Sequence, residues 1–271
     1  MLFTCPICGG RFLAPSDGRL ACKLGHSFDR SRDGYYNFLL SASSGTHGDD
    51  REMLRARRAF LDTGAYFPLA EAISKILTER MPRGGALLDA GCGEGYYTNI
   101  FERALTARDG SSCVAGLDVS KDAVRLAAKR SSETELAVAS VYKIPSEDGA
   151  FDAAVSIFSP LAREELLRVL KRGGIFIMAI PDKRHLFGLK KILYEHPYEN
   201  KPEGTELSGF RLLSEERIAY PLVLDSQDKI SGLFRMTPYA YRTPPEAKAR
   251  LAALTSLECE AEFIVLCYEK L

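Results

Sequence analysis

The sequence predicts an α/β fold preceded by a small metal-binding module. Between residues 86 and 180, short apolar runs alternate with segments of helical periodicity. The first of these runs ends in a turn that holds three glycines, and cysteines are concentrated before residue 27. Because alternating helices and unbroken apolar strands form parallel sheets covered on both faces, we expect a Rossmann-like, doubly wound main domain.

Length, charge and composition limit the class of protein. The chain has 271 residues, enough for one main domain and an appendage, and its 36 basic and 36 acidic residues cancel. Net charge therefore neither supports nor excludes a nucleic-acid partner. No stretch approaches the roughly 20 apolar residues of a membrane span, and the first residues lack the layout of a secretory signal, so we expect a cytoplasmic protein.

The first 26 residues hold a predicted zinc site, formed by Cys5, Cys8, Cys22 and His26 in the pattern C-x2-C-x13-C-x3-H. Each close pair fits a tight turn, and a hairpin between the pairs would bring the two turns together around tetrahedral zinc. A redox-active C-x-x-C dithiol is the competing interpretation, but it leaves the second pair unexplained. Four protein ligands leave no open coordination position, so we expect a structural zinc that folds a module of residues 1–40.

The other cysteines have no such spacing. In a reducing compartment we expect them to be small buried hydrophobic residues. They are Cys92, Cys113, Cys259 and Cys267.

Residues 41–60 are predicted to connect the module to a main domain of residues 61–271. The first half of this connection, from residue 41 to residue 50, is rich in Ser, Gly and Asp, as flexible linkers are. The second half is predicted to be a helix whose arginines share one face: Arg51, Arg55 and Arg58. This face is either a solvated side, the usual role of charge runs, or a surface for phosphates.

The main domain is predicted to begin with a helix and to continue with alternating strands and helices. We expect helices over 69–80, 95–105, 121–130 and 162–170, and strands over 86–90, 113–118, 135–139, 152–158 and 174–180. After residue 200 we expect a further strand, two helices around Pro244 and a last strand over 260–268. A ligand of such a fold lies beyond the carboxyl ends of the strands, at the topological switch point.

The glycine turn at that switch point predicts the cofactor. Gly91, Gly93 and Gly95 allow a tight turn and let a ligand lie against bare backbone. Related G-x-G-x-x-G turns hold a pyrophosphate at a helix N-terminus. Here Asp89 and Glu94 place negative charge at that position, which disfavours phosphates and favours a cationic cofactor. The glycines alone would also fit an ordinary tight connection between strand and helix.

S-adenosylmethionine (SAM) carries a sulfonium and an ammonium, so carboxylates around the turn suit it. The segment resembles motif I of class I SAM-dependent methyltransferases. Asp118 ends the next apolar run, at the position from which such folds bind ribose hydroxyls.

Six segments spread over nearly the whole chain point to one family. They are the paired C-x2-C and C-x3-H-x-F-D motifs, R-R-A-F-L-D-x-G-x-Y over 57–66, G-C-G-E-G-Y-Y-T over 91–98, G-L-D-V-S-K over 116–121, R-H-L-x-x-L over 184–189 and M-T-P-x-A-x-R over 236–242. With them the chain resembles the RlmA group of large-subunit ribosomal RNA guanine-N1 methyltransferases. The resemblance implies that Tyr66, Gly93 and Glu94 line the SAM site and that Leu189 closes it.

The resemblance also implies a homodimer and a zinc module that helps to hold a hairpin of 23S rRNA. Basic residues near the metal would add RNA contacts: Arg11, Arg19, Lys23, Arg30 and Arg32. Nearby aromatic rings would either stack on unpaired bases or form the core of the module. We favour the core for Phe12 and Phe28 and leave both roles open for Tyr35 and Tyr36.

Transfer to guanine N1 would need in-line alignment with the methyl donor and removal of the N1 proton. The segment over 156–160 lacks the Asn/Asp-Pro-Pro-aromatic motif of exocyclic-amine methyltransferases, which is compatible with a ring-nitrogen target. Asp182 and His185 either lie near the acceptor or bond only the loop, so the sequence assigns no base. Two alternatives stay open: a SAM enzyme that acts on a small molecule, and a non-enzymatic zinc RNA-binding protein.

Overall fold

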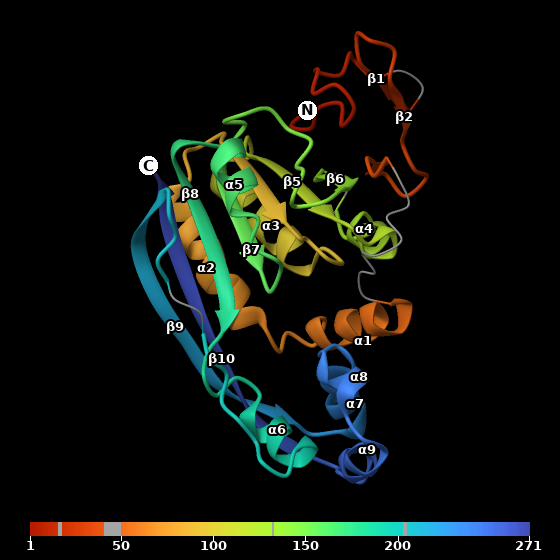
Figure 1. The fold of residues 1–271 in the computed structure, drawn as a ribbon, viewed down its shortest axis with the longest axis vertical. Coiled ribbons are helices and arrows are strands. Elements are labelled where there is room, and N and C mark those ends of the chain that lie inside the picture. Colours follow the sequence, from red (N-terminus) through yellow and green to blue (C-terminus); the bar gives the residue numbers. More distant parts are fainter. Residues whose placement is uncertain (16–17, 41–49, 132, 203–204) are drawn as a thin grey trace.

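The computed structural model describes residues 1–15, 18–40, 50–131, 133–202 and 205–271. An eight-stranded sheet forms its centre, with the order β3-β6-β5-β4-β7-β8-β10-β9 (Figure 1). Neighbouring strands from β3 to β8 are parallel, whereas β10 is antiparallel to both β8 and β9. The expected Rossmann-like sheet is confirmed, and its switch point lies at β4, which has β5 on one side and β7 on the other.

The strands agree closely with the expected ranges. Those of the main domain are β4 (Ala86–Ala90), β5 (Cys113–Asp118), β6 (Glu135–Val138), β7 (Phe151–Ile157), β8 (Leu170–Pro181), β9 (Phe210–Leu224) and β10 (Leu257–Lys270). The strand β8 begins four residues earlier than the expected 174, because the helix before it ends at Val169 and the chain extends at once.

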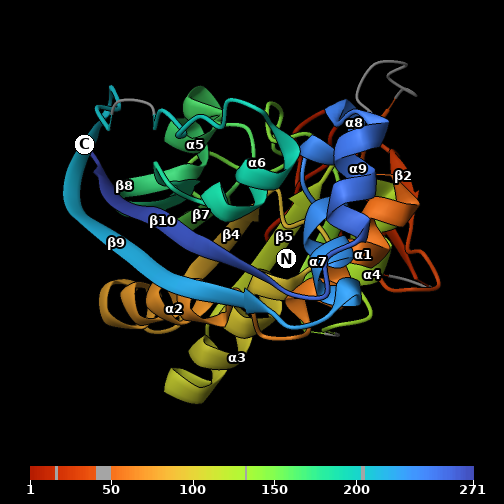
Figure 2. The ribbon, with the colours of Figure 1, turned by 90° about the horizontal axis from the view of Figure 1, so that it is seen from below.

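Helices cover both faces of the sheet (Figures 1 and 2). They are α1 (Arg51–Leu61), α2 (Phe67–Arg80), α3 (Tyr96–Asp109), α4 (Lys121–Ala127), α5 (Arg163–Val169), α6 (Phe187–Leu193), α7 (Gln227–Arg235), α8 (Tyr239–Arg242) and α9 (Pro245–Ala252). Apolar side chains of α2 and α3 pack on one face, and those of α5 pack on the other. The helices α6 to α9 gather at the end toward which β8 points (Figure 1).

Some elements differ from the expectation. The helices α6 and α7 were not expected from the sequence, and α4 ends three residues before the expected 130. Residues 129 and 130 instead donate backbone hydrogen bonds three positions back, which closes a turn. The linker expected over 41–50 lies outside the described residues except for Asp50, which caps α1 by accepting a hydrogen bond from the Met53 amide. No helix in the described part of the chain combines the length and apolar character needed to cross a membrane.

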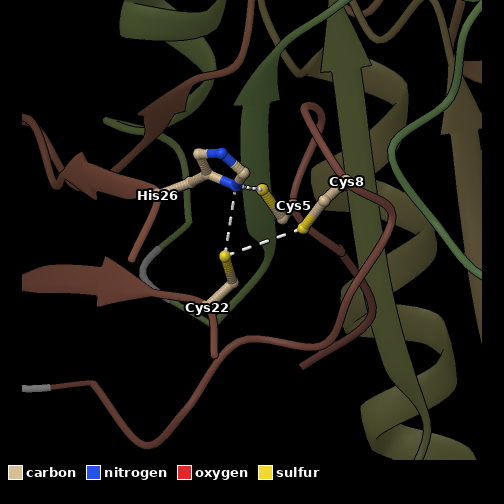
Figure 3. A group of neighbouring side chains, drawn as sticks. All are labelled: Cys5, Cys8, Cys22 and His26. Carbon is tan, nitrogen blue, oxygen red and sulfur yellow. Dashed lines mark hydrogen bonds between the residues drawn. The ribbon is translucent and has the colours of Figure 1, made fainter. Parts of the chain in front are cut away.

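The N-terminal module is a hairpin fastened to the edge of the sheet. Its strands β1 (Arg19–Ala21) and β2 (Ser27–Asp29) pair antiparallel, as the zinc pattern predicts, and they bring its two turns together (Figure 3). Its last strand, β3 (Tyr36–Asn37), pairs with β6 in the main sheet. The Thr4 amide donates to the Pro145 carbonyl at 2.7 Å, and Arg11 forms a paired ion contact with Glu147. The module is therefore attached along a broad contact with the main domain.

Aromatic residues form the core of this contact. Phe12, Phe28 and Tyr36 surround Phe38 with ring centroids 5.2 to 5.9 Å apart, which confirms a core role for Phe12 and Phe28. Tyr35 is buried with Cys92 of the glycine turn and residues of α4 and β6. Both tyrosines therefore support the fold in this structure.

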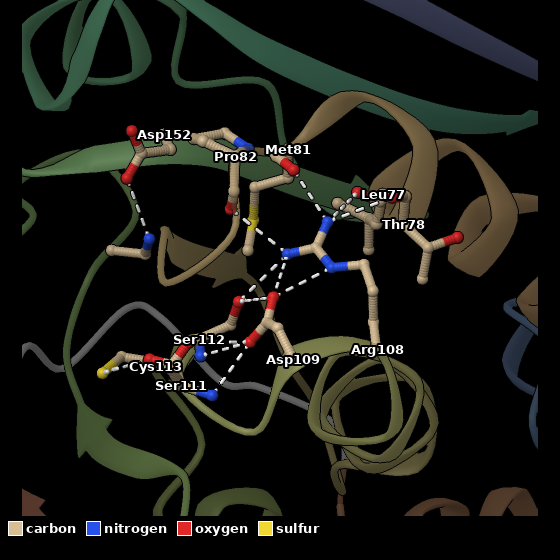
Figure 4. A network of polar contacts seen from close by, with 11 residues as sticks. Leu77, Thr78, Met81, Pro82, Arg108, Asp109, Ser111, Ser112, Cys113 and Asp152 are labelled. Carbon is tan, nitrogen blue, oxygen red and sulfur yellow. Dashed lines mark hydrogen bonds and ion pairs between the residues drawn. The ribbon is translucent and has the colours of Figure 1, made fainter.

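A polar network holds α2 against α3 (Figure 4). The Arg108 guanidinium donates to the carbonyls of Leu77, Thr78 and Met81 at the C-terminal end of α2. Its other nitrogens bond Asp109, which also accepts hydrogen bonds from the amides of the following turn. Because the last carbonyls of a helix lack helical partners, one arginine both caps α2 and fixes the angle between the helices.

Candidate active site and zinc centre

The three glycines of the turn after β4 all have left-handed φ angles, 92° at Gly91, 54° at Gly93 and 83° at Gly95. A Cβ at Gly91 would lie 2.5 Å from the Cβ of Ser159, and one at Gly95 would lie 2.8 Å from Ala127. At Gly93, apart from the glycine itself and its two chain neighbours, no atom of the described residues lies within 4 Å of that position. The outer glycines thus permit close packing, whereas a side chain at the middle glycine would project into open space.

Asp118 closes this turn from the neighbouring strand. Its Oδ2 accepts a hydrogen bond from the Gly93 amide at 3.1 Å, and its Oδ1 accepts one from the Ser120 amide at 2.8 Å. Because β4 and β5 are parallel neighbours, both end at the same edge of the sheet. The structure therefore brings together the open glycine and the half-buried carboxylate predicted to bind a ribose.

Asp89 lies deeper than the sequence suggests. It is buried in β4, where the Thr98 hydroxyl donates a hydrogen bond to Oδ2 at 2.5 Å. Burial raises the pKa of this carboxyl to about 7, against the opposing effect of the Thr98 hydrogen bond. Asp89 therefore ties β4 to the first turn of α3, and its raised pKa weakens its negative charge near neutral pH.

Glu94 is also buried, and its charge is neutralised within the protein. Arg130 donates from Nε to Oε2 at 2.7 Å and from Nη2 to Oε1 at 3.0 Å. The same Nη2 pairs with Asp62 at 2.8 Å. A buried carboxylate without a partner would be costly, which explains the pairing. Glu94 thus anchors the turn to the connection between α1 and α2, and its expected attraction for a cationic cofactor is reduced.

Tyr66 and His185 form a buried pair at the carboxyl edge. The Tyr66 hydroxyl lies 3.4 Å from His185 Nε2, and His185 Nδ1 accepts a hydrogen bond from the Glu262 amide. This acceptor role places the proton of the neutral ring on Nε2. Burial, aided by the charge of Lys190, lowers the pKa of His185 to about 3. His185 is therefore neutral, with both ring nitrogens engaged.

The remaining candidates serve the fold in this structure. Leu189 is fully buried in α6, which packs on β10, so its side chain is not open to a cofactor. Asp182 accepts a hydrogen bond from the Lys183 amide and pairs with Arg217 of β9. Asp182 therefore bonds its own loop, which is one of the two roles that the sequence left open for this residue.

Two of the three arginines on the predicted face of α1 contact other parts of the protein. Arg51 pairs with Asp122 at 2.8 Å, and Arg58 donates to the Leu126 carbonyl, so both reach toward α4. Arg55 stays exposed.

One expected burial is wrong: Cys113 is exposed, because it begins β5 at the amino edge of the sheet. The other three cysteines outside the zinc group are buried, as expected.

Cys5, Cys8, Cys22 and His26 converge on one point, with all ligand atoms within 4.8 Å of one another (Figure 3). Cys8 Sγ lies 3.7 Å from Cys22 Sγ, and His26 Nδ1 lies 3.6 Å and 3.4 Å from Cys5 and Cys22. Tetrahedral zinc with Zn–S bonds of about 2.3 Å requires sulfur–sulfur edges of about 3.8 Å and slightly shorter sulfur–nitrogen edges. These four side chains therefore have the spacing of a tetrahedral zinc site, and it is His26 Nδ1 that faces the sulfur atoms.

Sequence reasoning missed several residues of the candidate active site. Arg130 and Ser159 carry no motif, because their roles depend on partners 36 and 68 residues away in the chain, Glu94 and Gly91. Thr98 belongs to the segment over 91–98, and a hydroxyl in the first turn of the helix after the glycines was the available signal. Together, the fold and the turn define a class I SAM-dependent methyltransferase.

Comparison with known proteins agrees with this class and narrows it. A family model described as a methyltransferase domain matches residues 83–230, and one described as RlmA, N-terminal, matches residues 3–41. The chain is 33% identical to Bacillus subtilis YxjB, a provisionally assigned 23S rRNA (guanine-N1)-methyltransferase, over 98% of this chain and 96% of that protein. It is 32% identical to the 23S rRNA (guanine(748)-N(1))-methyltransferase of Streptomyces fradiae, over 92% and 89% of the two chains. The chain belongs to the RlmA family of methyltransferases.

A solved structure supports the fold alone. A provisionally assigned type II methyltransferase from Anaeromyxobacter dehalogenans superposes with a TM-score of 0.50 at 19% identity, over 72% of this chain and 94% of that one.

Proposed function

We propose that this enzyme transfers the methyl group of SAM to N1 of a guanine in a hairpin loop of 23S rRNA. The observation that carries the proposal is a single combination: the zinc module and the methyltransferase sheet occur in one chain whose similarity to a 23S rRNA guanine-N1 methyltransferase spans 92% of its length. A ribosomal RNA substrate also implies action in the cytoplasm.

The cofactor site consists of the turn and its neighbours. We assign SAM binding to Tyr66, Asp89, Gly91, Gly93, Glu94, Gly95, Asp118 and Leu189. The open space at Gly93 and the adjacent Asp118 carboxylate support the assignment most directly. Bound SAM supplies an electrophilic methyl group. Asp89, Glu94 and the outer glycines hold the shape of the turn, and Leu189 would need a shift of α6 to reach the cofactor.

Proton removal from guanine N1 is not assigned to either residue considered from the sequence. His185 has a pKa of about 3, because it is buried and lies near Lys190, and its nitrogens already bond Tyr66 and Glu262. Asp182 is bonded to Lys183 and Arg217. A base with a pKa far below that of the donor gains little proton-transfer driving force, so His185 is a poor candidate.

The RNA-binding surface includes exposed cations that remain free. Among the described residues, Lys23, Arg32 and Arg55 are exposed and have no ion-pair partner, unlike Arg11, Arg19 and Arg51. Free cations contribute most to phosphate binding, since each releases a counterion without breaking a protein contact. The zinc module of residues 1–40 and the helix within residues 41–60 would thus hold the hairpin, and residues 61–271 would carry out the transfer.

The test uses 23S rRNA from a strain that lacks the gene. Because a methyl at N1 blocks base pairing, reverse transcriptase should stop one residue before the modified guanine only when the gene is restored. The position of the stop would identify the guanine. A restored Asp118→Ala variant should give no stop. If the stop is absent with the wild-type gene and purified enzyme methylates only small molecules, the RNA assignment is wrong.

The family resemblance also supports a homodimer. Light scattering of the purified protein should give twice the 29.9 kDa chain mass. A monomer at micromolar concentration would contradict this part of the proposal.

A further inference from the structure

Phe158 is an exposed aromatic residue held in an unusual backbone conformation. It follows β7 at the carboxyl edge of the sheet, with 45% of its surface exposed. Its φ angle is 54°, and among the described residues the only other non-glycine with positive φ is Leu186. Such a conformation costs free energy for a bulky residue and persists only where surrounding contacts impose it, which occurs often at functional sites.

The contacts that impose this conformation reach the cofactor turn. The Phe158 amide donates to the Ala179 carbonyl of β8 at 3.2 Å. The next residue, Ser159, donates to the Ala90 carbonyl at the end of β4 and bonds Ser156, both at 2.7 Å. Ser159 also occupies the space that a Cβ of Gly91 would need. Phe158 is thus fixed one residue from a direct contact with the methyl-donor turn.

The ring is supported from within the core. Its centroid lies 5.6 Å from that of Phe263, which is fully buried, and 6.5 Å from that of His185 at an interplanar angle of 25°. Leu186, the other strained residue, is adjacent to His185 in the chain. The Phe158 ring is therefore packed against the core, while part of its surface stays accessible.

The position of Phe158 indicates which of two molecules its ring contacts, the methyl donor or the methyl acceptor. The open backbone of Gly93 and the Asp118 carboxylate lie on the β4 and β5 side of the switch point, whereas Phe158 belongs to β7 on the opposite side of β4. A methyl acceptor must approach on the side away from the donor's own binding groups. Phenylalanine offers no hydrogen bond, so it recognises a flat π-surface, and a base must leave its stack before its N1 can be reached.

We propose that Phe158 is the stacking platform for the guanine that receives the methyl group. The assignment rests on the proposed RNA methylation and adds the substrate-binding residue that positions the base for in-line attack.

The test compares aromatic and aliphatic side chains at this position. Phe158→Leu and Phe158→Met keep apolar contact with Phe263 but remove the aromatic face, and Phe158→Tyr keeps it. Leu161→Ala, which shortens another exposed apolar residue of the same loop, is the control. Each purified protein is assayed for SAM affinity by calorimetry, for thermal unfolding, and for kcat and KM with 23S rRNA from the deletion strain.

We expect Phe158→Leu and Phe158→Met to bind SAM as the wild type does and to lose roughly 5- to 150-fold in kcat/KM for RNA, the range of one base–aromatic stack. Phe158→Tyr and Leu161→Ala should stay close to wild type. A wild-type kcat/KM for RNA in both aliphatic variants would overturn the stacking assignment but leave the proposed function intact. A loss of SAM affinity as large as the loss of transfer would also overturn it, since the ring would then contact the donor. Absence of RNA methylation by the wild type would overturn the proposed function and this assignment together.

Discussion

Arg130 and the buried Glu94 form a two-point ion pair at the glycine turn after β4, with nitrogen–oxygen distances of 2.7 and 3.0 Å. The same guanidinium contacts Asp62 between α1 and α2. One side chain therefore links the glycine turn, the turn after α4 and the end of α1.

Removing the guanidinium should destabilise the protein strongly. Arg130→Met leaves a buried carboxylate without a partner, and such losses cost about 3–5 kcal/mol in the free energy of unfolding. The double variant Arg130→Met with Glu94→Gln should recover much of this loss, because no buried charge remains. Urea unfolding of the wild type, both single variants and the double variant measures the coupling. Additive effects would show that the pair contributes no interaction energy.

Gly93 should be required for cofactor binding more than for folding. An alanine there keeps a left-handed φ, at a cost of about 1–2 kcal/mol, but places its methyl group in the open space assigned to SAM. We expect at least tenfold weaker SAM binding by calorimetry. Gly84→Ala is the control, since Gly84 also has positive φ (68°) but precedes β4 at the opposite edge. Equal SAM affinity in the two variants would argue against this cofactor position.

Asp118 should affect SAM binding through both its charge and its hold on the turn. Asp118→Ala removes the acceptor for the Gly93 and Ser120 amides, so we expect SAM affinity to fall tenfold or more. Asp122→Ala removes a carboxylate of the next helix that pairs at the surface with Arg51. This control should bind SAM normally, and a similar loss in both variants would indicate a general effect of charge.

The zinc site should be lost with any one of its ligands. The purified protein should contain about one zinc per chain, and Cys8→Ser should contain little. Because the module shares its core with the main sheet, we also expect a lower Tm without the metal. Cys113→Ser, which changes an exposed cysteine outside the group, should keep both metal and Tm. Full zinc content in Cys8→Ser would mean that the ligand set is wrong.

Stability should fall in mild acid because of His185. Burial, aided by Lys190, lowers its pKa from 6.5 to about 3, so between these values the unfolded chain binds a proton that the folded protein does not. Stability must then decrease as pH falls from 6.5 toward 3, by up to about 1.4 kcal/mol per pH unit from this group. His185→Gln should show a shallower decrease in urea unfolding between pH 6.5 and 4. His196→Gln, at an exposed histidine, should keep the wild-type slope, and equal slopes in all three proteins would exclude His185 as the cause.

The sequence by itself determined the features that depend on local spacing. The intervals between Cys5, Cys8, Cys22 and His26 predict a four-residue metal-binding cluster, because each pair fits one turn, and the structure brings the four side chains together. The three glycines define the turn after β4, and Asp118 ends the next strand, since apolar runs mark parallel strands that finish at one edge. Local backbone chemistry suffices for such features.

Only the tertiary structure decided how the charges and rings are used. Glu94 has an acidic side chain in the sequence, but its field is cancelled by Arg130, a partner 36 residues away. Tyr35 and Tyr36 carry aromatic rings in the zinc module, and packing against the main sheet assigns them to the core. Phe158 is exposed beside Ser159, whose hydroxyl donates a hydrogen bond to the Ala90 carbonyl of a different strand. Burial and long-range partners set these roles, and neither can be derived from the spacing of residues along the chain.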